Sequence, residues 1–283
     1  MSPAARTTVQ ESAPAKVNLV LHVGQPRADG LHELCSLFAS VDLADAVTVG
    51  PSASGRDEVE CSVPIEGPNL AASALVAFRN AAPRQPPPLR VQIEKRIPVA
   101  AGLGGGSADA AAVLRAANEL AGASLDVVEL RRLGAGLGSD VPSQVEPGHA
   151  LVSGAGELVE PIRLPPMTLV LVPAPHGLAT REVYAEADRI GATRQGLDSA
   201  AVRTMAQLPL EQLARAMDND LETAALSLRP ELETTQAQLL AHGALAARVS
   251  GSGPTVFGVF ATPAAAREAA AAVPDATVAA LLG

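Results

Sequence analysis

Residues 98–112 read PVAAGLGGGSADAAA, a run of glycines that opens an alanine-rich segment. The residues before it, 89–97, alternate apolar and polar side chains and so predict a β-strand. The alanine-rich residues 108–121 predict an α-helix, with Ser107 as its N-cap and Asp109 in its positive first turn. A glycine-rich turn that leads from a strand into a helix presents backbone N–H groups to an anion. We therefore expect this turn to bind phosphate.

The glycine run matches neither of two well-known nucleotide-binding motifs. It has no lysine where a Walker A loop requires one, and Ser107 stands in place of the third glycine of a GxGxxG motif. A glycine cluster alone is most often a flexible loop, so the flanking strand and helix are what favour anion binding. Gly102, Gly104, Gly105 and Gly106 are expected to adopt positive φ angles and to let the backbone approach a ligand closely.

Two more glycine-rich turns follow, GAGLGSD at residues 134–140 and VSGSGPT at 249–255. Asp140 ends the first of them, where a lone Asp is usually a turn or capping residue. Lys16 lies in a strand predicted at 15–23, where an isolated lysine is usually solvated at the strand edge. Together, however, glycine turns, a cation and a carboxylate are what phosphoryl transfer needs, because that reaction depends on positioning and charge.

The rest of the chain mixes strands and helices without the regular alternation of a parallel sheet. The pattern further predicts helices at 69–82, 126–133 and 263–273, a strand at 46–49, a hairpin at 150–159, a strand at 167–172, and two strands around a turn at 247–260. The proline-rich residues 161–166 favour a domain boundary. We expect an α+β fold in two domains, residues 1–162 and residues 163–283.

Composition excludes several classes of function. The chain has 283 residues and a formal net charge of -9 without a basic stripe, so we do not expect nucleic acid as a partner. The two cysteines, Cys35 and Cys61, are expected to be reduced thiols, since their spacing suggests neither a disulfide framework nor a metal site. Residues 1–14 lack the apolar segment of a signal peptide, and no apolar run is long enough to span a membrane. We therefore expect a cytoplasmic protein with no membrane partner.

The motifs occur in an order that resembles the GHMP superfamily of small-molecule kinases. Its three characteristic motifs are similar to APAKVNLVL at 13–21, to residues 98–112, and to VSGSGPTVFGVF at 249–260. Three further segments narrow the resemblance: RADGLHEL at 27–34, GSDVP at 138–142 and MDNDLE at 217–222. With these, the chain resembles the family of GHMP kinases that act on 4-diphosphocytidyl-2-C-methyl-D-erythritol.

The resemblance implies a two-domain GHMP kinase fold. Residues 1–162 would form an ATP-binding and catalytic domain of the ribosomal-protein-S5 type, and residues 163–283 a ferredoxin-like, substrate-binding domain. The phosphoryl donor would be ATP with Mg²⁺ bound to the nucleotide, and no metal would be held by protein side chains. The acceptor would be the 2-hydroxyl of the small-molecule cytidyl-diphosphate substrate, in the non-mevalonate pathway of isoprenoid biosynthesis.

The resemblance also assigns residues to the site. Lys16 and Asp140 match the catalytic pair of the family. The substrate-binding positions are Asn18, His32, Phe38 and Tyr184. The ATP-binding loop comprises Pro98, Val99, Ala100, Ala101, Gly102, Leu103, Gly104, Gly105, Gly106, Ser107 and Ala108. Two positions depart from the usual family pattern, because Leu31 and Ser143 stand where aromatic residues are common.

Three other interpretations stay open from the sequence. The chain could be another GHMP-type kinase, acting on homoserine, mevalonate or a sugar, although residues 27–34 and Tyr184 argue against this. It could be a catalytically silent nucleotide-binding protein, against which the intact Lys16 and Asp140 argue. It could be an RNA-binding module, because S5-type folds occur in ribosomal proteins, but the net charge of -9 argues against that.

Overall fold

The computed structural model describes residues 8–65 and 67–283 of the chain. The strands are β1 (Val9–Pro26), β2 (His32–Pro51), β3 (Glu58–Cys61), β4 (Leu89–Glu94), β5 (Ala150–Gly154), β6 (Leu158–Pro161), β7 (Thr168–Val172), β8 (Ala246–Val249), β9 (Val256–Phe260) and β10 (Thr277–Ala280). The helices are α1 (Leu70–Ala81), α2 (Gly105–Leu120), α3 (Val127–Ala135), α4 (Val141–Gln144), α5 (Thr180–Ile190), α6 (Ser199–Met205), α7 (Leu210–Ala216), α8 (Glu222–Leu228), α9 (Glu231–Ala241) and α10 (Pro263–Ala272).

No helix in the described part of the chain combines the length and the apolar character needed to cross a membrane. Residues 1–7, on which the expectation about a signal peptide partly rests, lie outside the described residues.

The chain divides into two compact units, each made of several segments. The first comprises Met1–Ala15, Ala44–Val99 and Gly104–Pro147. The second comprises Lys16–Leu43, Ala100–Leu103 and Gly148–Gly283. Strands β1 and β2 contribute residues to both units, and so does the glycine-rich loop. The expected domains, residues 1–162 and 163–283, stay a prediction.

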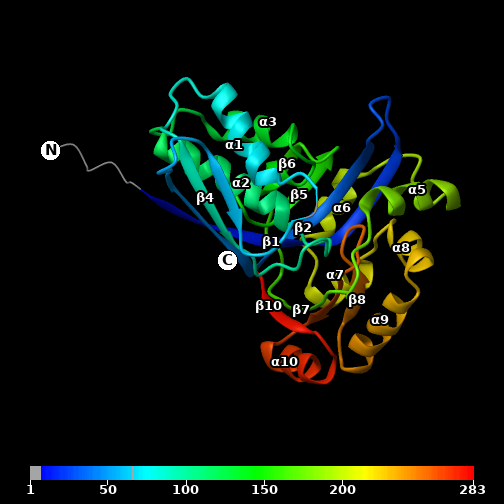
Figure 1. Ribbon diagram of the computed structural model, residues 1–283. Coiled ribbons are helices and arrows are strands. Elements are labelled where there is room, and N and C mark those ends of the chain that lie inside the picture. The colour runs from blue at the N-terminus through cyan, green and yellow to red at the C-terminus, as the bar shows by residue number, and fades with distance from the viewer. Residues whose placement is uncertain (1–7, 66) are drawn as a thin grey trace. The chain divides into compact units, whose positions relative to one another are not determined.

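The core of the first unit lies between a sheet and two helices. Strand β4 pairs with β3 in parallel and with β2 in antiparallel orientation, with Val47 opposite Ile93. Helices α1 and α2 lie side by side against this sheet (Figure 1). The alanines of α2 share one buried cluster with Phe78 of α1 and Val91 of β4. Helix α2 is apolar on most of its faces because it is buried on most of them.

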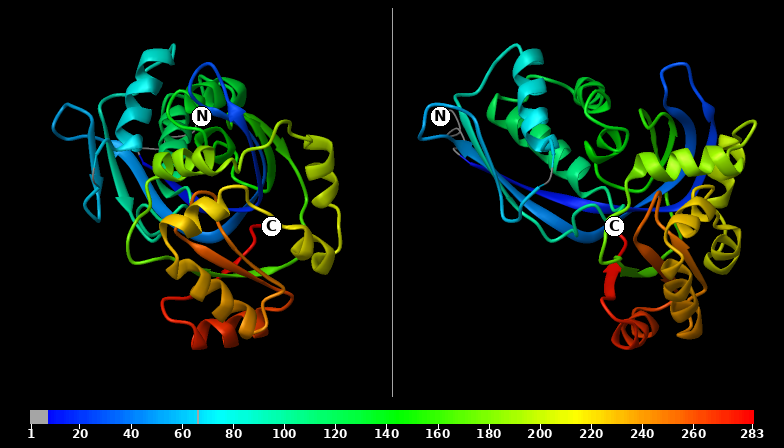
Figure 2. Two further views of the ribbon diagram at one scale, coloured as in Figure 1. Left: turned by 90° about the vertical axis from the view of Figure 1, so that its right-hand side faces the viewer. Right: turned by 45° about the vertical axis from the view of Figure 1, so that its right-hand side comes forward.

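The second unit contains a hairpin and a separate four-stranded sheet. Strand β5 pairs with β2, where Leu34 lies opposite Gly154, and forms with β6 the hairpin expected at 150–159. The four-stranded sheet has the order β10-β7-β9-β8 and is antiparallel throughout. Helices α9 and α10 pack on this sheet (Figure 2). Gly258 of β9 leaves room for α9, since a Cβ there would lie 3.3 Å from Cδ2 of Leu239.

The α+β class expected from the sequence is confirmed. The helix expected at 69–82 is α1, and the strand expected at 89–97 is the shorter β4. The main difference is β2, because the strand expected at 46–49 is the end of a strand of 20 residues. Its acidic residues Asp42 and Asp45 interrupt the apolar alternation that would have revealed the whole strand.

Candidate active site

The first half of the glycine-rich loop, residues 100–103, packs against the third glycine turn within the second unit. The backbone N–H of Thr255 donates a hydrogen bond of 3.2 Å to the carbonyl oxygen of Ala101. Gly102 has a φ of 76°, and a Cβ added to it would contact the carbonyl oxygen of Gly253 and lie 2.8 Å from its carbonyl carbon. A side chain at Gly102 would therefore be strained by the backbone angle and would also strike the opposite turn. Two of the glycine motifs are thus in direct contact.

The second half of the loop forms the first turn of helix α2 in the first unit. The helix begins at Gly105, and its N-cap is Gly104 in the left-handed conformation with a φ of 72°. The expectation of Ser107 as N-cap and of Asp109 in the first turn is therefore wrong. Glycine adopts a left-handed angle without penalty, so the helix starts before its alanine run. The expected positive φ is confirmed at Gly102 and Gly104. It is wrong for Gly105 and Gly106, which are helical.

The start of α2 suits an anion. Gly104 supplies no side-chain hydrogen bond to the first turn of the helix. The first backbone N–H groups of a helix have no acceptor within it, and the helix dipole places partial positive charge there. A phosphate group would satisfy these N–H groups. The geometry of the loop therefore fits the phosphate-binding role expected for residues 98–108.

Lys16 is buried in β1 and contacts other expected site residues of the second unit. Its Nζ donates a hydrogen bond of 2.7 Å to Oδ1 of Asn18 and lies 4.7 Å from the centre of the Phe38 ring. Its backbone N–H donates a hydrogen bond of 3.0 Å to the carbonyl oxygen of Leu103 in the glycine-rich loop. Only 5 % of Lys16 is exposed, so this residue is not a solvated lysine at a strand edge.

Asn18 connects this lysine to two serines that the sequence did not single out. Its Nδ2 donates a hydrogen bond of 2.9 Å to Oγ of Ser36, which donates in turn to the carbonyl oxygen of Val20 at 2.6 Å. The backbone N–H of Asn18 donates to Oγ of Ser250 at 3.3 Å. Because both ends of the Asn18 amide are bonded, its oxygen stays directed at Lys16. Ser250 lies in a recognisable glycine turn, whereas no local pattern marks Ser36.

His32 and Tyr184 lie together, at the start of β2 and on helix α5. Their ring centres are 4.9 Å apart, and the rings are tilted by 46°. Nε2 of His32 lies 2.9 Å from Oδ1 of Asp188 and donates its hydrogen there, since a carboxylate only accepts. Sequence reasoning missed Asp188, although its position one turn after Tyr184 on the same helix could have revealed it.

Asp140 lies in the first unit, at the start of the short helix α4. Its side chain makes no capping hydrogen bond to this helix. Oγ of Ser143 donates a hydrogen bond of 2.8 Å to the backbone carbonyl oxygen of Asp140, so the serine that replaces the usual aromatic residue holds the turn by a polar contact. Lys16 belongs to the second unit, and its pairing with Asp140 stays a prediction.

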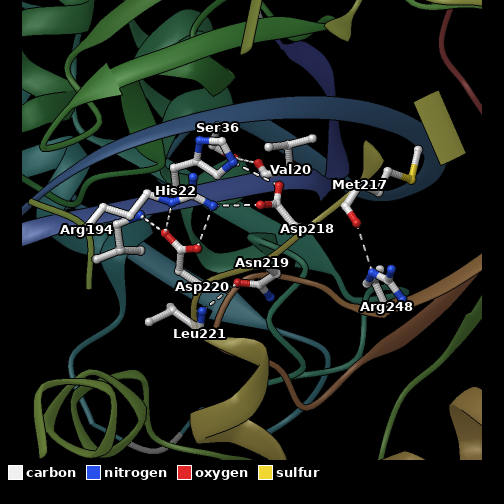
Figure 3. A network of polar contacts seen from close by, with 11 residues as sticks. Val20, His22, Ser36, Arg194, Met217, Asp218, Asn219, Asp220, Leu221 and Arg248 are labelled. Atoms are coloured by element: carbon white, nitrogen blue, oxygen red, sulfur yellow. Dashed lines mark hydrogen bonds and ion pairs between the residues drawn. The ribbon is translucent and has the colours of Figure 1, made fainter. Parts of the chain in front are cut away.

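The acidic segment 217–222 is the centre of a network of ion pairs in the second unit (Figure 3). Asp218 lies 2.8 Å from Nε2 of His22 and accepts a hydrogen bond of 2.6 Å from Arg194. Asp220 accepts two hydrogen bonds from the same guanidinium group, at 2.7 and 2.9 Å. Burial raises the pKa of Asp218, but the hydrogen bonds and charges of His22 and Arg194 outweigh this and hold the pKa below its usual range. The motif indicated the family, yet it did not reveal these contacts.

Both cysteines are free, and no side-chain group among the described residues is suited to a metal ion. Cys35 and Cys61 are free thiols, and burial raises the pKa of Cys35 to about 11, so this thiol stays protonated near neutral pH. Among residues 8–65 and 67–283, no three His, Cys, Asp or Glu side chains are grouped so that they could hold a metal ion. The candidate residues are backbone N–H groups in the first unit, and the Lys16 ammonium group with polar and aromatic side chains in the second.

Comparison with known proteins reveals the family. Residues 69–148 match the GHMP kinases N terminal domain, and residues 201–279 match the GHMP kinases C terminal domain. A 4-diphosphocytidyl-2-C-methyl-D-erythritol kinase of Anaeromyxobacter dehalogenans (strain 2CP-C) is 45 % identical over 271 residues, which cover 92 % of this chain and 83 % of that protein. The protein of the same name from Streptomyces coelicolor is 43 % identical, with 88 % of this chain and 86 % of that protein covered.

A solved structure shares the fold of the whole chain. The crystal structure of a 4-(cytidine 5'-diphospho)-2C-methyl-D-erythritol kinase has a TM-score of 0.80 to this chain at 37 % identity, with 97 % of this chain and 100 % of that one covered. The two-domain GHMP kinase fold implied by the motifs is thereby confirmed. Since the identity is this high over most of both chains, the protein belongs to the 4-diphosphocytidyl-2-C-methyl-D-erythritol kinase family of the GHMP kinases.

Proposed function

We propose that this kinase transfers the γ-phosphoryl group of ATP, carried as its Mg²⁺ complex, to the 2-hydroxyl of 4-diphosphocytidyl-2-C-methyl-D-erythritol. The observation that carries the proposal is the contact of Lys16 with the glycine-rich loop 98–108, which we call the nucleotide loop. The loop carbonyl of Leu103 accepts the backbone hydrogen bond of this lysine, and Asn18 holds its ammonium group. The 100–103 half of this loop is therefore in direct contact with a buried cation, and phosphoryl transfer depends on positioning and charge of this kind.

The nucleotide loop would bind the phosphates of ATP. The N–H groups at the start of α2 lack a side-chain cap and would donate to phosphate oxygens. Ser107 in the same turn adds a hydroxyl group for a phosphate oxygen or for the metal ion. Mg²⁺ bound to the nucleotide would neutralise charge on the phosphates. The hydrogen bond from Thr255 to Ala101 holds the first half of the loop in place.

The chemical step needs a proton acceptor and a cation. As the bond from the 2-hydroxyl oxygen to the γ-phosphorus forms and the bond to the β-phosphate oxygen breaks, Asp140 would accept the hydroxyl proton. The proton leaves late in a loose transition state, so a carboxylate of ordinary basicity suffices. Lys16 would stabilise the negative charge of the transferring group, because a fixed cation in a dry site acts strongly. Asn18, bonded on both sides, would keep that cation in one position.

The cytidine part of the substrate would bind at His32 and Tyr184. A tyrosine ring offers a face on which a pyrimidine base can stack, and an imidazole can hydrogen-bond a base edge. Asp188 fixes the orientation of the His32 ring, so the other ring nitrogen remains for the base. Phe38, beneath the Lys16 ammonium group, would contribute an apolar surface to the substrate site.

Parallel assays of ADP release test the proposal. The purified protein with Mg·ATP is offered 4-diphosphocytidyl-2-C-methyl-D-erythritol, homoserine, mevalonate or galactose, and the product is identified by mass and by ³¹P NMR. We expect turnover with the cytidyl substrate and a phosphomonoester on its 2-hydroxyl. A higher kcat/KM with any of the other acceptors would refute the substrate assignment. If no ADP is released with any of the four acceptors, the proposed reaction is refuted.

A further inference from the structure

Three buried charged side chains, Asp45, Lys95 and Asp109, lie beside the nucleotide loop in the first unit, and we call them the loop-end cluster. Nζ of Lys95 donates a hydrogen bond of 2.7 Å to Oδ2 of Asp109 and another to Oδ2 of Asp45. The side chain of Lys95 is 5 % exposed, and those of Asp45 and Asp109 are 0 % and 7 % exposed. The phosphoryl-transfer mechanism above uses none of these groups.

Asp45 holds the chain that enters the loop. Its Oδ1 accepts hydrogen bonds from the backbone N–H groups of Arg96 at 2.6 Å and Ile97 at 2.8 Å, immediately before Pro98. Its Oδ2 accepts from Lys95. A buried carboxylate needs its hydrogen-bond donors, so these three bonds oppose movement of the backbone at Arg96 and Ile97. The entry to the loop is therefore fixed by a residue of strand β2.

Asp109 holds the chain that leaves the loop. It lies one turn after Gly105, the first residue of α2, so its ion pair with Lys95 spans the loop from one end to the other. Gly105 packs directly on the cluster, because a Cβ added to it would lie 3.2 Å from Nζ of Lys95 and 3.0 Å from Cγ2 of Ile97. The first turn of the helix thus rests on the lysine.

Stability of the fold does not explain this cluster. Burying charged groups is costly, and apolar residues of similar size often stabilise a protein as well or better. Here one ammonium group serves two carboxylates, and Oδ1 of Asp109 has no hydrogen-bond partner among the described residues. Burial raises the pKa of Asp109 to about 6. The charge of Lys95 lowers this pKa, whereas the neighbouring Asp45 raises it. Because the buried charges and the unpartnered oxygen lower the stability of the fold, we look for the role of the cluster in ligand binding by the adjacent loop.

We propose that Lys95 is a positioning residue for nucleotide binding, which joins Asp45 to Asp109 and so holds both ends of the 98–108 loop in the conformation that presents the N–H groups of α2 to phosphate. This inference rests on the proposed role of the loop in binding ATP. A loop held in its binding conformation loses less conformational entropy when the ligand binds. Loss of the cluster should therefore weaken ATP binding, while binding of the acceptor substrate is unchanged.

The test compares Lys95→Met, Asp109→Asn and the control Arg96→Met in the full-length protein. Arg96 is the exposed neighbour of Lys95 and pairs with Glu94 at 3.1 Å, so the control removes a positive charge near the loop and leaves the cluster intact. If the binding conformation of the loop is populated only about one-tenth of the time, the apparent Kd rises about tenfold. We therefore expect the calorimetric Kd of Mg·ATP to rise at least about tenfold in Lys95→Met and less in Asp109→Asn. The Kd of Mg·ATP in Arg96→Met should change by less than about twofold. The KM of the acceptor should also change by less than about twofold in every variant.

Hydrogen exchange without nucleotide separates this inference from the proposed function. We expect the amides of residues 96–108 to exchange faster in Lys95→Met than in the wild type, with protection elsewhere in the first unit retained. If the wild type binds no Mg·ATP, the proposed function fails, and exchange still tests the loop-end cluster. Unchanged Kd and unchanged exchange in Lys95→Met and Asp109→Asn would overturn the inference. If Lys95→Met does not fold, the Kd of Mg·ATP and the hydrogen exchange of Asp109→Asn test the inference instead. A loss of protection throughout the first unit with an unchanged Kd would also overturn the inference.

Discussion

The side-chain amide of Asn219 donates a hydrogen bond of 2.8 Å to the backbone carbonyl oxygen of Gly251. The same nitrogen donates to the carbonyl oxygen of Val249 at 2.9 Å, and Oδ1 of Asn219 accepts from the backbone N–H of Leu221 at 2.9 Å. Figure 3 shows Asn219 beside Leu221, with this last hydrogen bond drawn between them. The glycine turn that packs on the nucleotide loop is thus held by a residue whose motif indicated the family but not this role.

Replacing Asn219 with alanine should loosen that turn. The carbonyl groups of Val249 and Gly251 would lose their donor, and an unsatisfied buried polar group costs about 1–3 kcal/mol. We expect the free energy of unfolding in urea to fall by about that amount, and the Kd of Mg·ATP to rise. The exposed Asn80 provides the control, since Asn80→Ala should change neither value. Equal behaviour of the two variants would contradict the role of Asn219.

Asp140→Asn keeps the size of the side chain and removes the proton acceptor. General-base catalysis is worth about 10²–10⁴-fold, so we expect a loss of that size in kcat with the Kd of Mg·ATP unchanged. Lys16→Met should likewise lower kcat, because its cation acts on charge in the transition state. Steady-state kinetics check both. Near-full turnover of Asp140→Asn would show that another group accepts the proton, and a change in KM alone would make Lys16 a binding residue.

Two alanine substitutions in the loop should have opposite consequences. A Cβ added to Gly106 finds Cδ1 of Leu70 at 3.8 Å as its nearest neighbour, so Gly106→Ala should fold normally. It should nevertheless weaken Mg·ATP binding, because the new methyl group lies where phosphate is proposed to approach the backbone. Gly102→Ala should instead lower the melting temperature, since its Cβ would strike Gly253. Undiminished ATP binding by a well-folded Gly106→Ala would place the phosphate elsewhere.

Tyr184→Ala should weaken binding of the cytidyl substrate selectively. Stacking of a base on an aromatic ring is worth about 1–3 kcal/mol, which corresponds to a rise of roughly 5- to 150-fold in its KM. His32→Ala should act in the same direction, and Leu31→Tyr should bind the substrate at least as well, because it adds an aromatic face. The KM of ATP is measured alongside as the control. An unmoved substrate KM in both alanine variants would show that the cytosine binds at another place.

The acid dependence of stability should report on Asp109, which faces Lys95 and Asp45. Burial raises the pKa of Asp109 in the folded protein to about 6, above the usual value of an aspartate, so between the two values the folded state binds more protons than the unfolded state. The Asp109 contribution to stability therefore falls as pH rises through this window and is constant above it. Relative to the wild type, Asp109→Asn should therefore gain unfolding free energy as the pH rises from 4 to 6.5. Urea denaturation at several pH values checks this, and parallel profiles would contradict it.

Some elements were predictable because their cause lies within a few residues of chain. The 150–159 hairpin, helix α1 and the glycine turns depend on local alternation, capping and backbone freedom, and all are visible in the sequence. The start of α2 was predicted wrongly, because Ser107 is a good capping residue but Gly104 turns the chain first. Strand β2 was underestimated, since its acidic Asp45 serves the loop-end cluster rather than the apolar pattern.

The α+β class and the kinase family follow from the sequence alone, because each motif of glycine, lysine and aspartate residues depends on a few neighbouring positions. The contacts between distant side chains become visible only in the folded chain. Ser36 orients Asn18, Asp188 orients His32, and Lys95 joins the two ends of the loop. These partners lie on different strands and helices, and among them only Asp188, one turn after Tyr184, has a local signal in the sequence. Their contacts arise when packing of the cores brings distant segments together, where burial makes each hydrogen bond necessary.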